Sequence, residues 1–238
     1  MDGYTDIHCH ILPGADDGAP DMDEALRMAE ISYSQGIRRI IATPHTDERK
    51  RRLSSTETES VFLSLKEEIN KRFRDMRFFL GNEIRYASDV KRGLQSEEIY
   101  TLAGSRCVLM EFSTIDMFER IYSGLKEMML LGYVPVLAHA ERYDCLRSDM
   151  GRLVDIKELG AYIQLNCADI MAGTFDSTGR WTRKMIKEGF CDLIASDSHS
   201  STWRSPVMAD AVTKLERLTD KASLQKILFE NTEMIFER

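Results

Sequence analysis

The chain has 238 residues, of which 43% are hydrophobic and 30% charged, and its formal net charge is -7 at pH 7. This composition is typical of a globular protein with a sizeable core, and the acidic balance argues against general binding to nucleic acid or to a membrane surface. The five cysteines form no C-x-x-C pair, so we expect reduced thiols and no disulfide framework. The sequence shows neither a secretory signal nor a membrane-spanning run, which predicts a cytoplasmic protein.

Predicted strands and helices alternate along the chain, because short apolar runs are separated by longer amphipathic ones. The first helix is expected to be capped by Asp21, with Glu24 at the spacing of a capping box. The predicted strands are 5–8, 39–43, 77–80, 107–112, 134–138, 162–165 and 192–195. The predicted helices are 21–34, 56–73, 118–131, 146–158, 180–188, 207–218 and 223–229.

This alternation predicts βαβ units and a parallel sheet in a fold of the α/β class. About seven such units without a G-x-G-x-x-G or P-loop sequence favour a closed or nearly closed barrel over a doubly wound nucleotide-binding sheet. No repeat or linker divides the sequence, so we expect a single domain over residues 1–238.

The histidines and several acidic residues stand at or just beyond the ends of the predicted strands. In a β/α barrel the carboxyl ends of the strands share one face, and the loops on that face build the active site. Glu111 is notable because a carboxylate inside an apolar run must find a partner or lose its charge. We expect eight side chains to converge there: His8, His10, His45, Glu83, Glu111, His139, Asp197 and His199.

Such a ligand set predicts a cluster of metal ions. Imidazoles mixed with carboxylates suit manganese, iron or zinc, and they suit calcium or magnesium poorly. Eight donors exceed what one ion accepts at roughly four- to six-fold coordination, so we expect two or three ions with a bridging carboxylate. Bridged ions lower the pKa of a shared water and polarise phosphoryl oxygens, which predicts in-line hydrolysis of a phosphate ester.

A positive side chain at the rim would complete a phosphate site. Arg142 is the best placed candidate, followed by Arg85 and then Arg204, although each could instead be a structural ion-pair partner. Cys9 lies between two candidate ligands on an alternating strand and is expected to face the opposite side. A cysteine-dependent phosphatase is excluded, because it needs an arginine six positions after its cysteine. The residues at that spacing are Ala15, Ser113, Gly151, Gly173 and Asp197.

Six segments, in this order, resemble the bacterial PHP-type (polymerase and histidinol phosphatase) protein-tyrosine phosphatases of capsule and exopolysaccharide operons. They are DIHCHILPGADDGAPDMDEALRMA, IIATPH, GNEIRY, LMEFS, VLAHAERY and IASDSHS. The H-x-H opening is shared across the superfamily, whereas the ILPG-x-DDG, G-x-EIR and HAERY elements are narrower. The resemblance implies a distorted (β/α)7 barrel of the PHP fold with three metal ions, usually manganese, with iron or zinc as alternatives. It also implies attack by a metal-bridging hydroxide on phosphotyrosine of an autophosphorylating bacterial tyrosine kinase that controls polysaccharide export.

The resemblance further implies how the ligands divide among the ions. The two histidines of the H-x-H opening would bind one ion together with Asp197. Glu83 would bridge to a second ion held by Glu111 and His139.

The third ion would be held by His45, His199 and an aspartate of the DDG loop. Asp17 is favoured over Asp16 for this role, and the loop length leaves the choice open. Arg142 matches the family's phosphate-contacting arginine. The candidate catalytic residues are therefore Arg142, Asp17, Arg85 and Arg204.

The loop after IIATPH departs from many relatives, which carry a second histidine or an aromatic residue there. This chain has Thr46 and Asp47, followed by the basic stretch Arg49–Arg52. If that stretch is more than a solvated loop, it would favour an acidic phosphopeptide at the mouth of the site.

Two other functions fit the same motifs. One is a small-molecule phosphatase of the superfamily, such as a histidinol-phosphate phosphatase. The other is a catalytically silent metal-bound module that binds a kinase or accompanies a polymerase. No expected ligand position is missing from the sequence, which favours an active enzyme.

Overall fold

Parallel strands form the centre of the molecule in the computed structural model, which describes residues 3–47 and 49–237. They form two sheets, of order β1-β2-β3 and β4-β5-β6-β7-β8. Neighbouring strands within each sheet are parallel. The predicted α/β class with a parallel sheet is therefore confirmed. The strands are β1 Tyr4–Cys9, β2 Ile37–Ala42, β3 Arg77–Leu80, β4 Glu83–Arg85, β5 Cys107–Glu111, β6 Val134–Leu137, β7 Tyr162–Asn166 and β8 Leu193–Ala195.

All seven predicted strands are present, and β4 is an additional one. It has only three residues, too few to give a periodic signal in the sequence. It follows β3 after a gap of two residues, Gly81 and Asn82. Asn82 donates a side-chain hydrogen bond to the carbonyl oxygen of Pro44 at 2.8 Å and so holds the interruption against the end of β2.

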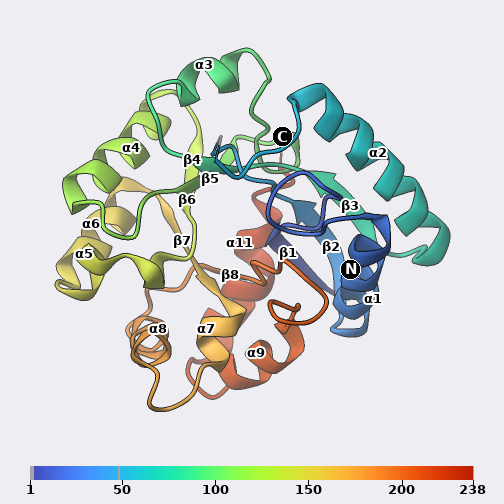
Figure 1. Ribbon diagram of the computed structural model, residues 1–238. Coiled ribbons are helices and arrows are strands. Elements are labelled where there is room, and N and C mark those ends of the chain that lie inside the picture. The colour runs from blue at the N-terminus through green and yellow to red at the C-terminus, as the bar shows by residue number, and fades with distance from the viewer. Residues whose placement is uncertain (1–2, 48, 238) are drawn as a thin grey trace.

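Helices α1 to α9 lie around the strands, whereas α11 lies close to their centre (Figure 1). The prediction of one continuous helix over 146–158 is wrong, because two separate helices, α5 and α6, occupy this region with a short non-helical segment between them. The Ser148 hydroxyl donates to the carbonyl oxygen of Cys145, and the Asp149 carboxylate accepts from the backbone N–H of Gly151. These local bonds compete with helix continuation. The helices are α1 Met22–Ser34, α2 Ser55–Arg72, α3 Val90–Gln95, α4 Phe118–Leu130, α5 Asp144–Arg147, α6 Gly151–Leu159, α7 Cys167–Met171, α8 Ser177–Lys187, α9 Met208–Leu215, α10 Lys221–Gln225 and α11 Asn231–Glu233.

The predicted cap of α1 is half correct. Asp21 accepts a hydrogen bond from the backbone N–H of Glu24 at 2.9 Å, as an N-cap residue does. The Glu24 carboxylate does not return to Asp21 and instead accepts from the backbone N–H and the hydroxyl of Ser201, at 2.6 and 3.0 Å. The reciprocal bond of a capping box is absent here, because Glu24 binds a distant loop.

Two joints connect the sheets at the carboxyl ends of the strands. Beyond β1 and β8, the backbone N–H of His10 donates to the carbonyl oxygen of Ser198 at 2.9 Å. Beyond β2, the backbone N–H of Thr46 donates to the carbonyl oxygen of Glu83 at 3.0 Å. The corresponding isolated bridges are Cys9 with Ser198 and His45 with Glu83.

Two apolar cores lie on the two sides of the strands. The larger one packs strand residues such as Val108 and Met110 against the helices, and it includes Cys9. The smaller one combines residues of five strands with Ile235 near the C-terminal end, and Figure 1 shows α11 close to the centre of the strands. Because side chains alternate along a strand, Glu111 shares the face of Leu109 in this inner core. None of the described helices is both long and apolar enough to cross a membrane.

Candidate metal centre

The structure brings together all eight side chains that the sequence places at strand ends. His8 lies near the end of β1, Glu83 begins β4 and Glu111 ends β5, whereas the others follow their strands within a few residues. His8 and His10 face the same side, because their Nε2 atoms are 3.1 Å apart. Cys9 lies in the larger apolar core, on the helix side of the strands, and its sulfur is 3.1 Å from the Ser198 hydroxyl. It therefore faces away from the histidine cluster, as predicted.

The carboxylate of Glu83 occupies the centre of the cluster. Its Oε1 is 2.7 Å from Nε2 of His139, and its Oε2 is 2.8 Å from Nδ1 of His45. The same Oε2 lies 3.3 Å from Nε2 of His10 and 3.4 Å from Nε2 of His8. Burial alone would raise the pKa of Glu83, but the surrounding imidazoles lower it well below its usual range. An ionised carboxylate is therefore held among four imidazoles.

Potential ligand atoms form three overlapping groups, each within reach of one ion. The first group agrees with the ion that the resemblance assigns to the H-x-H opening. In the second, His45 takes the place expected for His139, which instead contacts Glu83 directly and lies 4.0 Å from Glu111. The groups are His8, His10 and Asp197; His45, Glu83 and Glu111; and His10, Asp17, His45 and His199.

The two aspartates of the DDG loop have different positions. Asp17 Oδ1 lies 3.3 Å from Nε2 of His45 and 3.5 Å from Nε2 of His199, and its side chain is 40% exposed. Asp16 is buried, and its Oδ2 lies 2.7 Å from Nδ1 of His10 and accepts from the backbone N–H of His45 at 3.0 Å. This geometry favours Asp17 as the ligand and gives Asp16 the task of orienting His10.

The loop geometry depends on Gly18, the glycine of the DDG motif. A Cβ at this position would overlap the carbonyl oxygen of His10. The backbone N–H of Gly18 also donates to Oδ1 of Asp16 at 2.9 Å. A residue without a side chain therefore lets the two aspartates approach the histidines.

Two amides on β7 support the cluster, and sequence analysis missed both. Gln164 Oε1 lies 3.1 Å from Nδ1 of His8 and accepts from the backbone N–H of His139 at 3.0 Å. Asn166 donates to Asp197 Oδ2 at 2.8 Å and accepts from Gln164. Fixing Nδ1 of His8 directs its Nε2 lone pair toward the cluster. The available signal was two uncharged polar residues at alternate positions of a buried strand.

The cluster contains buried polar atoms that are unsatisfied, which fits a bound cation. Among the described residues, Oε2 of Glu83, Nδ1 of His45 and Nε2 of His199 are buried without an aligned hydrogen-bond partner. Such atoms cost free energy unless a ligand binds them. His139 and Asp197 also have positive φ angles of 33° and 49°, a strained conformation for residues with a side chain. The donors and the strain both fit metal ligation.

Arg142 and Arg204 share one oxygen of the cluster. Oδ2 of Asp197 lies 3.2 Å from a guanidinium nitrogen of Arg142 and 2.6 Å from one of Arg204. Arg85 lies farther from the acidic groups, 3.8 Å from Glu111 Oε2. Arg204 therefore lies closer to the carboxylates of the cluster than Arg85 does, because the loop after His199 folds Arg204 back onto Asp197.

The basic stretch Arg49–Arg52 is not one uniform patch. Arg49 pairs with Asp47 at 2.7 Å. Lys50 Nζ lies 2.7 Å from Nε2 of His45 and 3.5 Å from Oδ2 of Asp17, at the edge of the cluster. Sequence analysis did not distinguish this lysine from its neighbours.

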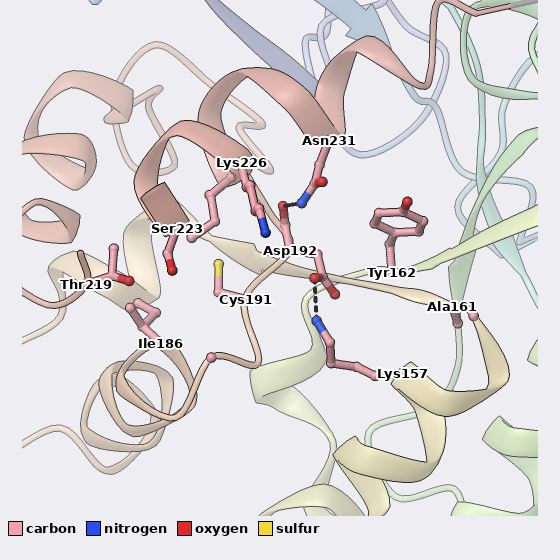
Figure 2. A pocket seen from close by; sticks show the side chains of 13 residues that line it. Lys157, Ala161, Tyr162, Ile186, Cys191, Asp192, Thr219, Ser223, Lys226 and Asn231 are labelled. Carbon is pink, nitrogen blue, oxygen red and sulfur yellow. Dashed lines mark hydrogen bonds and ion pairs between the residues drawn. The ribbon is translucent and has the colours of Figure 1, made fainter. Parts of the chain in front are cut away.

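A separate cavity of about 470 Å³ lies at the opposite ends of β7 and β8 (Figure 2). Tyr162 at the start of β7 and Asp192 just before β8 line it, and Lys157 pairs with Asp192. Asn231 donates to the carbonyl oxygen of Asp192 at 2.8 Å. None of the cluster residues lines this cavity, and its polar contacts connect the C-terminal segment to the sheet.

A family model for "Capsular polysaccharide synthesis, CpsB/CapC" matches residues 4–237. The chain belongs to the CpsB/CapC family. The tyrosine-protein phosphatase CpsB of Streptococcus agalactiae is 31% identical over 240 residues, covering 98% of both chains. The tyrosine-protein phosphatase YwqE of Bacillus subtilis is 31% identical over 232 residues, covering 97% of this chain and 90% of the relative.

Solved structures agree with this membership of the CpsB/CapC family. One, from work on YwqE of Bacillus subtilis and CpsB of Streptococcus pneumoniae described as unique metal-dependent tyrosine phosphatases, matches with a TM-score of 0.89 at 28% identity. The match covers 97% of this chain and 93% of that one. An organophosphorus hydrolase from Deinococcus radiodurans matches with a TM-score of 0.63 at 11% identity, which shows a shared fold only. The resemblance seen in the sequence is confirmed for the family.

We expect metal binding to this family member to release protons near neutral pH. Burial is the largest single influence on the pKa of His45 and lowers it, but the charge of Glu83 together with the hydrogen bonds to Asp17 and Glu83 raises that pKa to about 9. Asp16 raises the pKa of His10 despite burial. Both rings are therefore protonated at pH 7 without metal, and a metal ion needs their lone pairs. The apparent affinity for Mn²⁺ should rise from about pH 6 to pH 9. Calorimetry in buffers of different ionisation enthalpy measures the release, and net proton uptake would contradict it.

Proposed function

We propose that this protein is a metal-dependent protein-tyrosine phosphatase. The observation that carries the proposal is a buried cluster of imidazoles and carboxylates that shares Asp197 with Arg142 and Arg204. The relatives named above as tyrosine-protein phosphatases support it, since they match over nearly the whole chain. Ion clusters beside arginines are suited to phosphate ester hydrolysis.

The proposed architecture is a distorted (β/α)7 barrel of the PHP fold in a single domain over residues 1–238. Seven strands result when β3 and β4 are counted as one strand interrupted at Gly81 and Asn82. Closure of the ring is supported by the backbone hydrogen bond between the segments that follow β1 and β8, and by the one between the segment that follows β2 and Glu83 at the start of β4.

For the metal centre we propose three manganese ions, with iron or zinc as alternatives. His8, His10 and Asp197 would hold the first, and Glu83 with Glu111 would hold the second. When bound, the ions would supply a water of lowered pKa and would polarise the phosphoryl oxygens. The remaining ligands are His45, His139, Asp17 and His199.

Within this proposal the arginines bind and orient the phosphoryl group. Burial alone would lower the pKa of Arg142, but the charges of Asp197 and Asp169 raise it, so the guanidinium stays charged. Asp169 Oδ2 accepts from Nε and Nη2 of Arg142 at 3.3 and 3.2 Å, which fixes the plane of the guanidinium. Arg204 contacts the same Asp197 oxygen at 2.6 Å. An autophosphorylated tyrosine kinase as substrate and a cytoplasmic location remain predictions.

The proposed activity predicts chelator-sensitive hydrolysis of a phosphotyrosine peptide by the manganese-loaded protein. We expect a higher kcat/KM for the peptide than for histidinol phosphate, measured by phosphate release. A strong preference for histidinol phosphate would indicate the small-molecule phosphatase instead. Absence of chelator-sensitive turnover in a metal-loaded preparation would favour the silent binding module.

Replacing Arg142 should separate catalysis from metal binding. The Arg142→Ala protein is expected to keep its metal, because Arg142 donates none of the ligand atoms. It should lose about 10²–10³-fold in kcat, as expected for removal of a charged donor to the reacting group. Elemental analysis and phosphotyrosine peptide turnover check the two parts. Arg72→Ala, at the exposed end of α2, is the matched control, and equal losses in both variants would contradict the assignment.

A groove of about 490 Å³ beside the cluster supports a role for the basic stretch in substrate choice. Arg49, Arg51, Arg85 and Arg92 line it. Three acidic side chains, Asp47, Asp89 and Glu98, line it as well, so the excess of positive charge is small.

Neutralising two of these arginines tests that role. Arg49→Gln with Arg51→Gln should raise KM about three- to tenfold for a phosphopeptide with acidic flanking residues, since exposed pairs contribute about 0.2–1 kcal/mol each. KM for a peptide with neutral flanks should change less. Lys50 is left intact because it contacts His45. Identical kinetics of the variant and the wild type on both peptides would remove the hypothesis.

A further inference from the structure

A cavity of about 320 Å³ opens beside the two arginines that share Asp197. Its polar wall contains Arg142, Arg204 and Asp197, and its apolar wall contains Met171 and Trp203. The volume falls in the range of about 300–1,000 Å³ that is usual for small-molecule sites. The cavity is therefore continuous with the phosphate-binding side of the metal centre.

Trp203 is unusual because it is exposed and yet held in place. Its side chain is 71% exposed, and Met171 on α7 is 37% exposed. The loop that carries Trp203 closes through a hydrogen bond from the backbone N–H of His199 to the carbonyl oxygen of Arg204, at 3.0 Å. Glu24 on α1 accepts from the backbone N–H and the hydroxyl of the same loop, at Ser201. The indole is thus presented at the cavity by an anchored loop.

We propose that Trp203 and Met171 bind the aromatic ring of an aryl phosphate whose phosphate contacts Arg142 and Arg204. This inference rests on the proposed phosphatase function and assigns Trp203 as a specificity-determining residue. The guanidinium carbon of Arg204 lies 5.6 Å from the centre of the Trp203 ring. The charged and aromatic contacts are therefore close enough to be made by the two ends of one aryl phosphate.

The chemistry of the apolar wall favours a flat ring over an alkyl chain. Aromatic pairs in offset or edge-to-face arrangements are stabilised beyond the effect of the area they bury, and methionine sulfur makes favourable contacts with rings. An alkyl phosphate, including the phosphate of serine or threonine, would contact the arginines and leave the indole of Trp203 exposed. Selection of phosphotyrosine would then originate in this cavity as well as in the metal centre.

The test compares aryl with alkyl substrates on the metal-loaded full-length protein. In the Trp203→Ala protein, the ratio of kcat/KM for phenyl phosphate to kcat/KM for butyl phosphate should be about three- to tenfold lower than in the wild type. Trp203→Phe should retain most of the wild-type ratio, and Met171→Ala should lower the ratio because it removes the other apolar contact to the ring. Phe175→Ala is the matched control, because Phe175 is 96% exposed and does not line the cavity.

A second readout does not depend on turnover. Calorimetry should show that Trp203→Ala weakens binding of phenylphosphonate more than binding of methylphosphonate. An unchanged aryl-to-alkyl ratio in both Trp203→Ala and Met171→Ala, or an equal loss on both substrates, would overturn the inference. A wild-type protein that hydrolyses no phosphate ester would instead overturn the proposed function, and the phosphonate comparison would still decide whether the ring binds at Trp203.

Discussion

The burial of the Glu83 carboxylate among four imidazoles is the constraint on which the rest of the site depends. A charge removed from water must be balanced by nearby positive charge or by hydrogen bonds. Without a metal ion, the raised pKa values of His10 and His45 show that protons provide this balance. Metal ions can replace those protons while the imidazoles stay in position. Gln164 and Asp16 already fix the outward-facing nitrogens of His8 and His10, so the ligands are oriented before an ion arrives.

The same residues lie where the two sheets meet. The two sheets meet through isolated bridges at Cys9 with Ser198 and at His45 with Glu83, next to or within the cluster. Each joint has few backbone hydrogen bonds, in contrast to the longer pairings inside the sheets. A ligand that binds only the folded state stabilises that state. Ions bound by His8, Asp197 and Glu83 would therefore connect the edges of the two sheets, where few backbone hydrogen bonds join them.

The sequence was sufficient to predict the convergence of the ligands, because parallel strands place their carboxyl ends on one face. The sequence was insufficient to predict the position of a side chain where that position depends on how a loop folds. Asp17 and Asp16 are adjacent and chemically identical, and both contact histidines. Only the fold of the turn at Gly18 shows that Asp17 approaches the Nε2 atoms of His45 and His199, whereas Asp16 holds Nδ1 of His10. Gln164 and Asn166 alternate as uncharged polar residues on a buried strand, but this pattern does not identify the group that each of them contacts. Arg204 lies nine residues after the end of β8 at Ala195, and its approach to Asp197 depends on the hydrogen bonds that fold this loop.

Glu24 connects the first helix to the rim of the proposed substrate cavity. Its position in the sequence predicts a local bond to the backbone of Asp21, which would complete a capping box. Instead its carboxylate accepts two hydrogen bonds from Ser201, and the backbone bond lowers the pKa of Glu24, so that the carboxylate stays ionised. Helix α1 therefore lacks the hydrogen bond from the backbone of Asp21 to Glu24, and the loop that carries Trp203 is instead attached to the helix through Ser201. The local prediction therefore fails at a residue whose partner is distant in the sequence, because spacing along the helix does not indicate such a contact.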